Sequence, residues 1–136
     1  MVTKIAHLCL SSRNLAASIN FYCTVLGIPK KFDFVKNGTS IGVYLEVSPG
    51  NYIEFFEDTK HVPAKGTLSH LCLEVDDIDA IIAQVKRHSW PIGEKSIGPD
   101  NTWQVWIKDP DGVDIEFHQY TPESTQLTGK DCPVTW

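Results

Sequence analysis

The spacing of hydrophobic residues divides the first half of the chain into one helix and four strands. Apolar and polar residues alternate over 4–10, which puts leucines on one face of a strand and His7 on the other. A run with helical spacing follows, between an N-cap at Asn14 and a helix-ending Gly27. The apolar residues of that run are Leu15, Ile19, Tyr22 and Leu26. Three further strands are predicted, over 29–35, 41–47 and 52–57.

The second half of the chain repeats this order of elements. A linker is predicted over 61–66, where charge is combined with a proline and a glycine. A strand, a helix capped by Asp77 and three more strands follow it. These strands are expected over 67–75, 92–97, 102–108 and 113–119. Residues 121–136 turn polar and are interpreted as an extended tail. We therefore expect two βαβββ modules, over 1–60 and 67–120, in one domain.

Two short motifs occur once in each module. His-Leu-Cys-Leu begins at His7 and again at His70, and Ile-Glu-Phe is centred on Glu54 and again on Glu116. Each module therefore has a histidine in its first strand and a glutamate in its last. By alternation, all four side chains lie on the strand faces that do not pack against a helix. If the strands curve, those faces line a concave cavity.

Two histidines and two carboxylates suit a divalent transition metal with mixed nitrogen and oxygen ligands. Imidazole nitrogen disfavours Ca²⁺ and Mg²⁺, and the absence of a Cys-x-x-Cys pair argues against a closed structural zinc site. We expect Ni²⁺, Zn²⁺ or Co²⁺, with Mn²⁺ and Fe²⁺ as further candidates. Such a site keeps positions open for water or substrate. The expected ligands are His7, Glu54, His70 and Glu116.

Other residues share the faces that carry these ligands. Cys9 and Cys72 are interpreted as small residues of the cavity wall. His118 follows the second glutamate by two positions and is either a proton shuttle or the solvated end of the strand. Trp103 and Trp106 fall on opposite faces of one strand, so one of them is expected to line the cavity.

Composition and charge exclude several classes of function. The 136 residues suffice for one domain with a core, and the net charge of −5 argues against nucleic acid as a partner. No apolar run has the length of a membrane span. The four cysteines form no paired motif, and no apolar signal segment opens the sequence. We expect a cytoplasmic protein with reduced thiols.

These motifs resemble those of the glyoxalase/vicinal oxygen chelate superfamily, whose members contain paired βαβββ modules. Residues 21–27 are similar to the family pattern F-Y-x-x-x-L-G, and the turn 109–112 precedes Ile115-Glu116 as it does in the family. The resemblance covers about residues 4–120. It implies an α+β fold in which both modules form a curled mixed β-sheet around a metal-binding cavity. The residues that match the family's metal positions are His7, Glu54, His70 and Glu116.

The resemblance implies a metal-dependent lyase or isomerase of the glyoxalase I type, similar to lactoylglutathione lyase. Such an enzyme transfers a proton next to a carbonyl through a metal-bound enediolate, on a small hydroxy-carbonyl or hemithioacetal substrate. Glu116 is the first choice for the base and Glu54 the alternative. A homodimer is expected, because modules of this family often pair across chains. The site then lies within one chain or between two.

The sequence departs from the glyoxalase I pattern at two places. Those enzymes have an arginine shortly after the first ligand, where this chain has Ser11 or Ser12, and often an asparagine where this chain has Asp58. Both differences argue against glutathione as a partner. Two alternative functions are retained: a non-haem iron dioxygenase of the same fold, and a non-catalytic protein of the resistance type that binds a small molecule.

Overall fold

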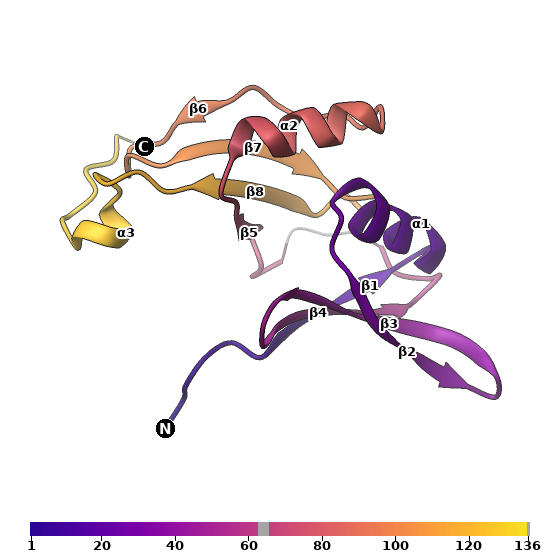
Figure 1. The fold of residues 1–136 in the computed structure, drawn as a ribbon. Coiled ribbons are helices and arrows are strands. Elements are labelled where there is room, and N and C mark those ends of the chain that lie inside the picture. Colours follow the sequence, from indigo (N-terminus) through magenta and orange to yellow (C-terminus); the bar gives the residue numbers. More distant parts are fainter. Residues whose placement is uncertain (63–65, 136) are drawn as a thin grey trace. The chain divides into compact units, whose positions relative to one another are not determined.

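The computed structural model describes residues 1–62 and 66–135, and the chain divides into two compact units, 1–64 and 65–136 (Figure 1). Each unit contains a four-stranded mixed sheet and a helical segment between its first two strands. This arrangement confirms the predicted α+β fold with two βαβββ modules. The predicted linker over 61–66 includes residues 63–65, which lie outside the described residues.

The first unit has its strands in the order β1-β4-β3-β2. The edge strand β1 runs parallel to its neighbour β4, and the other neighbouring strands are antiparallel. The helical segment lies between β1 and β2 and consists of α1, followed directly by the π-helix η1. The bounds are β1 (His7–Ser12), α1 (Leu15–Ile19), η1 (Asn20–Val25), β2 (Lys30–Lys36), β3 (Thr39–Ser48) and β4 (Asn51–Glu57).

The helical segment of the first unit starts and ends where the sequence indicates, but its second half is wider than an α-helix. The Asn14 side chain accepts a hydrogen bond from the Ala17 amide at 3.0 Å, as an N-cap does. The Leu26 amide donates to the Phe21 carbonyl, five residues earlier, at 3.0 Å. Gly27 then adopts a φ of 75°, which a glycine accepts at low cost, and ends the segment.

One face of the first sheet forms the core of its unit. Val43, Leu45, Ile53 and Phe55 alternate along β3 and β4 and are almost fully buried. The Tyr22 ring of η1 covers this face, with its centroid 4.6 Å from that of Phe55. Because successive residues of a strand point to opposite sides, burial of this face leaves the other face for polar and aromatic side chains.

The second unit repeats the topology with shorter strands, in the order β5-β8-β7-β6. The strand predicted over 67–75 begins only at Leu71, so His70 directly precedes it. The strand predicted over 92–97 is reduced to two residues. The bounds are β5 (Leu71–Glu74), α2 (Ile78–Arg87), β6 (Ser96–Ile97), β7 (Trp103–Lys108), β8 (Asp114–Gln119) and α3 (Thr125–Thr128).

Helix α2 covers one face of the second sheet. Asp77 caps it, accepting hydrogen bonds from the Asp79 and Ala80 amides at 2.9 and 3.0 Å. Ile78 and Val85 are fully buried where α2 packs on β7 and β8. None of the described helices combines the length and the apolar character that crossing a membrane requires.

The expectation of an extended tail is wrong for residues 121–128. This segment contains α3 and is hydrogen-bonded to the loop before β7. The Thr125 amide donates to the Asp100 carbonyl at 3.0 Å, and the Gln126 side chain donates to the Asp100 carboxylate at 2.6 Å. Ser124 is fully buried. The polar composition of the segment suggested that it is solvated, whereas in the structure its polar groups form hydrogen bonds within the protein.

Candidate metal-binding site

The first unit brings His7 and Glu54 together on its uncovered sheet face. They lie on the parallel neighbours β1 and β4, where Glu54 is paired with Cys9, two residues after His7. The Nε2 atom of His7 lies 3.4 Å from Oε1 of Glu54. Ile53 and Phe55 anchor β4 in the core on either side of Glu54, so the carboxylate points to the opposite face.

The second unit places His70 and Glu116 in the same way. Glu116 is paired with Cys72 across the parallel strands β5 and β8, again two residues after the histidine. The Nε2 atom of His70 lies 3.3 Å from Oε2 of Glu116. The sequence pattern predicts both histidines inside strands. Although His70 lies just outside β5, it makes the same contact as its counterpart.

The separation within each pair is compatible with shared ligation of one metal ion. Two ligands bound about 2.1 Å from one ion, at octahedral or tetrahedral angles, are about 3.0–3.4 Å apart. An N–H···O hydrogen bond normally spans about 2.7–3.2 Å. The observed distances of 3.4 and 3.3 Å lie outside the second range. Imidazole nitrogen with carboxylate oxygen is also a donor set that divalent transition metals accept, so these residues fit such an ion.

The other ring nitrogen of each histidine has a neighbour of its own. Nδ1 of His7 lies 3.4 Å from the Tyr44 hydroxyl, and Nδ1 of His70 lies 3.1 Å from the Ser69 hydroxyl. Partners of this kind orient the ring of a metal-binding histidine. In both units this arrangement leaves Nε2 facing the carboxylate.

The two glutamates differ in what their second oxygen contacts. Oε1 of Glu116 lies 2.9 Å from Nε2 of His118, a normal hydrogen-bond distance. The His118 side chain is only 13% exposed, so it is not a solvated strand end. The corresponding position in the first unit, two residues after Glu54, is Phe56, which has no polar group. A role for His118 as a proton shuttle stays a prediction.

Cys72 lies closer to Glu116 and His118 than its interpretation as a residue of the cavity wall suggested. Among the described residues, Cys72, Glu116 and His118 form a group whose donor atoms lie within 4.8 Å of one another. The Cys72 residue is exposed, but partial burial of its thiol, together with the charge and hydrogen bonding of Glu116, raises the pKa to about 12. Cys9 has a raised pKa for similar reasons, burial first and Glu54 second. Cross-strand pairing of each cysteine with a glutamate produces these contacts.

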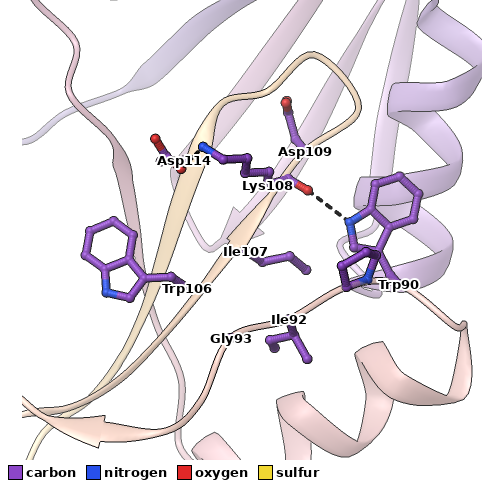
Figure 2. Close-up of a pocket in the computed structure, with 9 residues that line it drawn as sticks. Trp90, Ile92, Gly93, Trp106, Ile107, Lys108, Asp109 and Asp114 are labelled. Carbon is purple, nitrogen blue, oxygen red and sulfur yellow. Dashed lines mark hydrogen bonds and ion pairs between the residues drawn. The ribbon is translucent and has the colours of Figure 1, made fainter.

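A pocket of about 460 Å³ lies in the second unit, and none of the four proposed ligands lines it (Figure 2). Trp106 lines it and is paired with Glu116 across β7 and β8, with its ring 5.0 Å from that of His70. Of the two tryptophans in β7, Trp106 is therefore the one that lies beside the ligand residues. Figure 2 shows the Trp90 indole on the opposite side of the pocket, donating a 2.9 Å hydrogen bond to the Lys108 carbonyl. Such a volume accepts a small organic molecule.

Comparison with known proteins identifies the family. Residues 4–117 match the model of the Glyoxalase/Bleomycin resistance protein/Dioxygenase superfamily. The chain belongs to this superfamily. The glyoxalase superfamily assignment confirms the resemblance found from the duplicated motifs and accounts for the paired βαβββ units.

Relatives in the glyoxalase superfamily match nearly the whole chain. The uncharacterized protein YwbC of Bacillus subtilis is 31% identical over 125 residues, which cover 88% of this chain and 99% of that protein. A lactoylglutathione lyase of Neisseria meningitidis is 27% identical, covering 85% and 90%. The crystal structure of a glyoxylase/bleomycin resistance protein/dioxygenase domain from Frankia has the same fold, with a TM-score of 0.77 at 16% identity, covering 92% and 97%.

Proposed function

We propose that this protein is a metal-dependent lyase or isomerase that transfers a proton at the carbon next to a carbonyl group. The observation that carries the proposal is the duplicated His–Glu pair, one in each unit, with both pairs at the spacing of metal ligands. The similarity to a lactoylglutathione lyase supports the same class of reaction. The proposed ligands are His7, Glu54, His70 and Glu116.

A bound divalent ion would polarise the carbonyl and stabilise the negative charge that develops when the neighbouring carbon loses its proton. In this proposal Glu116 is the base, taking the proton and returning it to the adjacent carbon. His118 holds one oxygen of Glu116, which fixes the carboxylate and offers a path for the proton. Glu54 has no such histidine, and this difference favours Glu116 of the two glutamates.

We propose a small hydroxy-carbonyl or hemithioacetal substrate rather than a large glutathione conjugate. Ser12 occupies one position where an arginine would help to hold glutathione, but it is fully buried and its hydroxyl is 2.7 Å from that of Ser18. Asp58 adds a negative charge at a position where glutathione, itself anionic, would be repelled. A cytoplasmic homodimer is part of the same proposal.

The test is the metal content of protein purified without chelators or an affinity tag. The wild-type protein is expected to hold near-stoichiometric Ni²⁺, Co²⁺ or Zn²⁺ and to convert small hydroxy-carbonyl or hemithioacetal compounds. Glu116→Gln should reduce both the bound metal and the proton transfer, the latter by about a hundredfold or more, because the base is lost. Glu123→Gln is the matched control, since this exposed glutamate of the same unit lies outside the site.

The other outcomes identify the alternatives. Iron as the resident metal, with oxygen consumption, would replace the proposal with a dioxygenase. A wild-type protein that contains no metal and takes none up on reconstitution would contradict the catalytic proposal and favour a binding protein.

A further inference from the structure

The uncovered face of the first sheet carries a group of aromatic side chains, here called the aromatic face. Along β3 and β4 its members alternate with residues that point to the core, and along β2 they alternate with Asp33 and the exposed Val35. They stand on the same side of the sheet as His7 and Glu54, because Tyr44 is paired directly with Glu54. The aromatic face consists of Phe32, Phe34, Tyr44, Tyr52 and Phe56.

The rings of the aromatic face form one continuous surface. Phe32 stacks on Tyr44 with centroids 4.7 Å apart and an interplanar angle of 10°. Tyr44 contacts Tyr52 at 5.0 Å, and Phe34 contacts Phe56 at 4.6 Å. Phe34 also meets Phe32 edge-on at 5.2 Å. These distances are in the range where aromatic rings attract one another, so the surface is ordered by its own contacts.

Gly42 makes the contact between Phe34 and Phe56 possible. It lies between them, because it is paired with Phe34 on one side and Phe56 on the other. A Cβ atom at this position would lie 2.5 Å from the Phe55 carbonyl oxygen, 2.9 Å from a ring carbon of Phe56 and 3.2 Å from one of Phe34. Only glycine lets both rings close over the strand without displacement.

The core does not require these aromatic side chains. Phe32 remains 44% exposed, and the other four rings are half-buried, whereas the side chains on the opposite face of β3 and β4 are almost fully buried. An apolar patch that stays open to solvent indicates a binding surface.

The second unit shows that the fold is compatible with polar residues at these positions. Gln104, Asp114 and His118 occupy the register positions that correspond to Gly42, Tyr52 and Phe56. Only the position of Tyr44 keeps an aromatic residue, which is Trp106. The aromatic character is therefore specific to the first unit and is not a requirement of the repeated topology.

The aromatic face is continuous with the proposed ligands. The Tyr44 hydroxyl lies 3.4 Å from Nδ1 of His7, and the two ring centroids are 5.9 Å apart. A molecule whose polar end approaches His7 and Glu54 would therefore place the group attached to that end against Tyr44 and Phe32.

We infer that the aromatic face binds a flat aromatic group carried by the substrate, so that the preferred substrates are aryl-substituted hydroxy-carbonyl compounds. This inference rests on the proposed function for the position of the polar end. Ring stacking makes an aryl compound bind more tightly than its alkyl counterpart, by about tenfold.

Mandelate and lactate provide the test, because these two α-hydroxy acids differ only in a phenyl or a methyl group. Their affinities are measured by NMR titration on the wild-type protein as purified, on Phe32→Leu and on Phe34→Leu. Val35→Ala, at an exposed position of the same strand, is the control. Mandelate should bind about tenfold more tightly than lactate to the wild type and the control. The preference should fall to within about twofold in the ring variants.

Equal affinities for the two acids in the wild type would overturn the inference, as would a preference that both ring variants retain. A wild type without preference, combined with dissociation of an oligomer in Phe32→Leu during sedimentation, would overturn it by assigning the face to a subunit contact. Metal content is measured on the same samples. A ring-dependent preference without metal would support aryl binding while the proposed function fails. Bound metal with equal affinities would mean that the inference alone fails.

Discussion

Glu116 illustrates how single contacts distinguish two residues that the repeat makes equivalent. One oxygen faces His70 at 3.3 Å and the other faces His118 at 2.9 Å. Glu54 faces His7 alone among histidines in the described part of the chain. The motif Ile-Glu-Phe is the same in both units, and the distinction arises two residues later, at Phe56 and His118.

The reactivity of the Cys72 thiol should depend on the Glu116 carboxylate. With a pKa of about 12, it should have roughly a thousandfold less thiolate at pH 8 than an ordinary cysteine, and chelator-treated protein should react slowly with iodoacetamide at this site. Glu116→Gln removes a charge and a hydrogen bond that raise this pKa. Labelling should become several-fold faster but stay slower than for a free thiol, since burial persists. Mass spectrometry of the Cys72 peptide measures the rates, with Glu123→Gln as control. Equal rates in wild type and Glu116→Gln would contradict the contact.

At the scale of elements, the sequence places most helices and strands correctly but describes their ends and their width less well. The apolar spacing from Leu15 to Leu26 is compatible with an α-helix, yet the structure forms a π-helix over 20–25. One extra residue per turn changes the side-chain directions only gradually, so a short periodic run does not distinguish the two. Phe21 and Tyr22 of this wider helix are fully buried, and the Tyr22 ring packs on Phe55 of the first sheet.

The attachment of the segment 121–128 should depend on pH through Asp100. Burial alone would raise the pKa of Asp100, but hydrogen bonds from Gln126 and Thr102 outweigh it and hold the pKa below its ordinary value. A lowered folded pKa means that the stabilisation is complete above the unfolded value, about 3.9, and is lost as the pH falls through the folded one.

Asp100→Asn is expected to weaken the attachment by about 1–2 kcal/mol near neutral pH and to remove this acid dependence, because the charge-assisted bond is lost. Hydrogen exchange of the Thr125, Leu127 and Thr128 amides measures the effect. Asp131→Asn, at an exposed position near the end of the chain, is the control. Protection that is the same in Asp100→Asn and wild type would show that Asp100 does not hold the segment.

At the scale of the whole molecule, the central feature is that each unit supplies one His–Glu pair. The proposal of a four-ligand site therefore predicts that both units are needed. His7→Ala/Glu54→Gln and His70→Ala/Glu116→Gln should each lower the metal content to less than about a tenth of the wild-type value, because either change removes half of the donors.

Elemental analysis and isothermal titration with Ni²⁺ or Zn²⁺ measure the loss. His88→Ala/Glu94→Gln is the matched control, since both residues are exposed and lie away from the pairs. Full metal content in the variant of the first unit would assign the ion to the second unit alone, where Cys72 and His118 lie beside Glu116.

The sequence by itself determined the two modules, the order of helices and strands along the chain, and the four proposed ligands. These features follow from local periodicity and from motifs that recur one module later, so they need no knowledge of which strands are neighbours. Alternation also assigned each ligand to the sheet face opposite the core.

Only the tertiary structure decided which of these residues meet. Pairing of β5 with β8 brings Cys72 beside Glu116, and the rotamers on that face bring His118 to 2.9 Å from the same carboxylate. The register of β2, β3 and β4 likewise assembles five scattered aromatic residues into one surface around Gly42. A strand pattern specifies a face, whereas the neighbours across that face depend on register, which is set by packing of the whole unit.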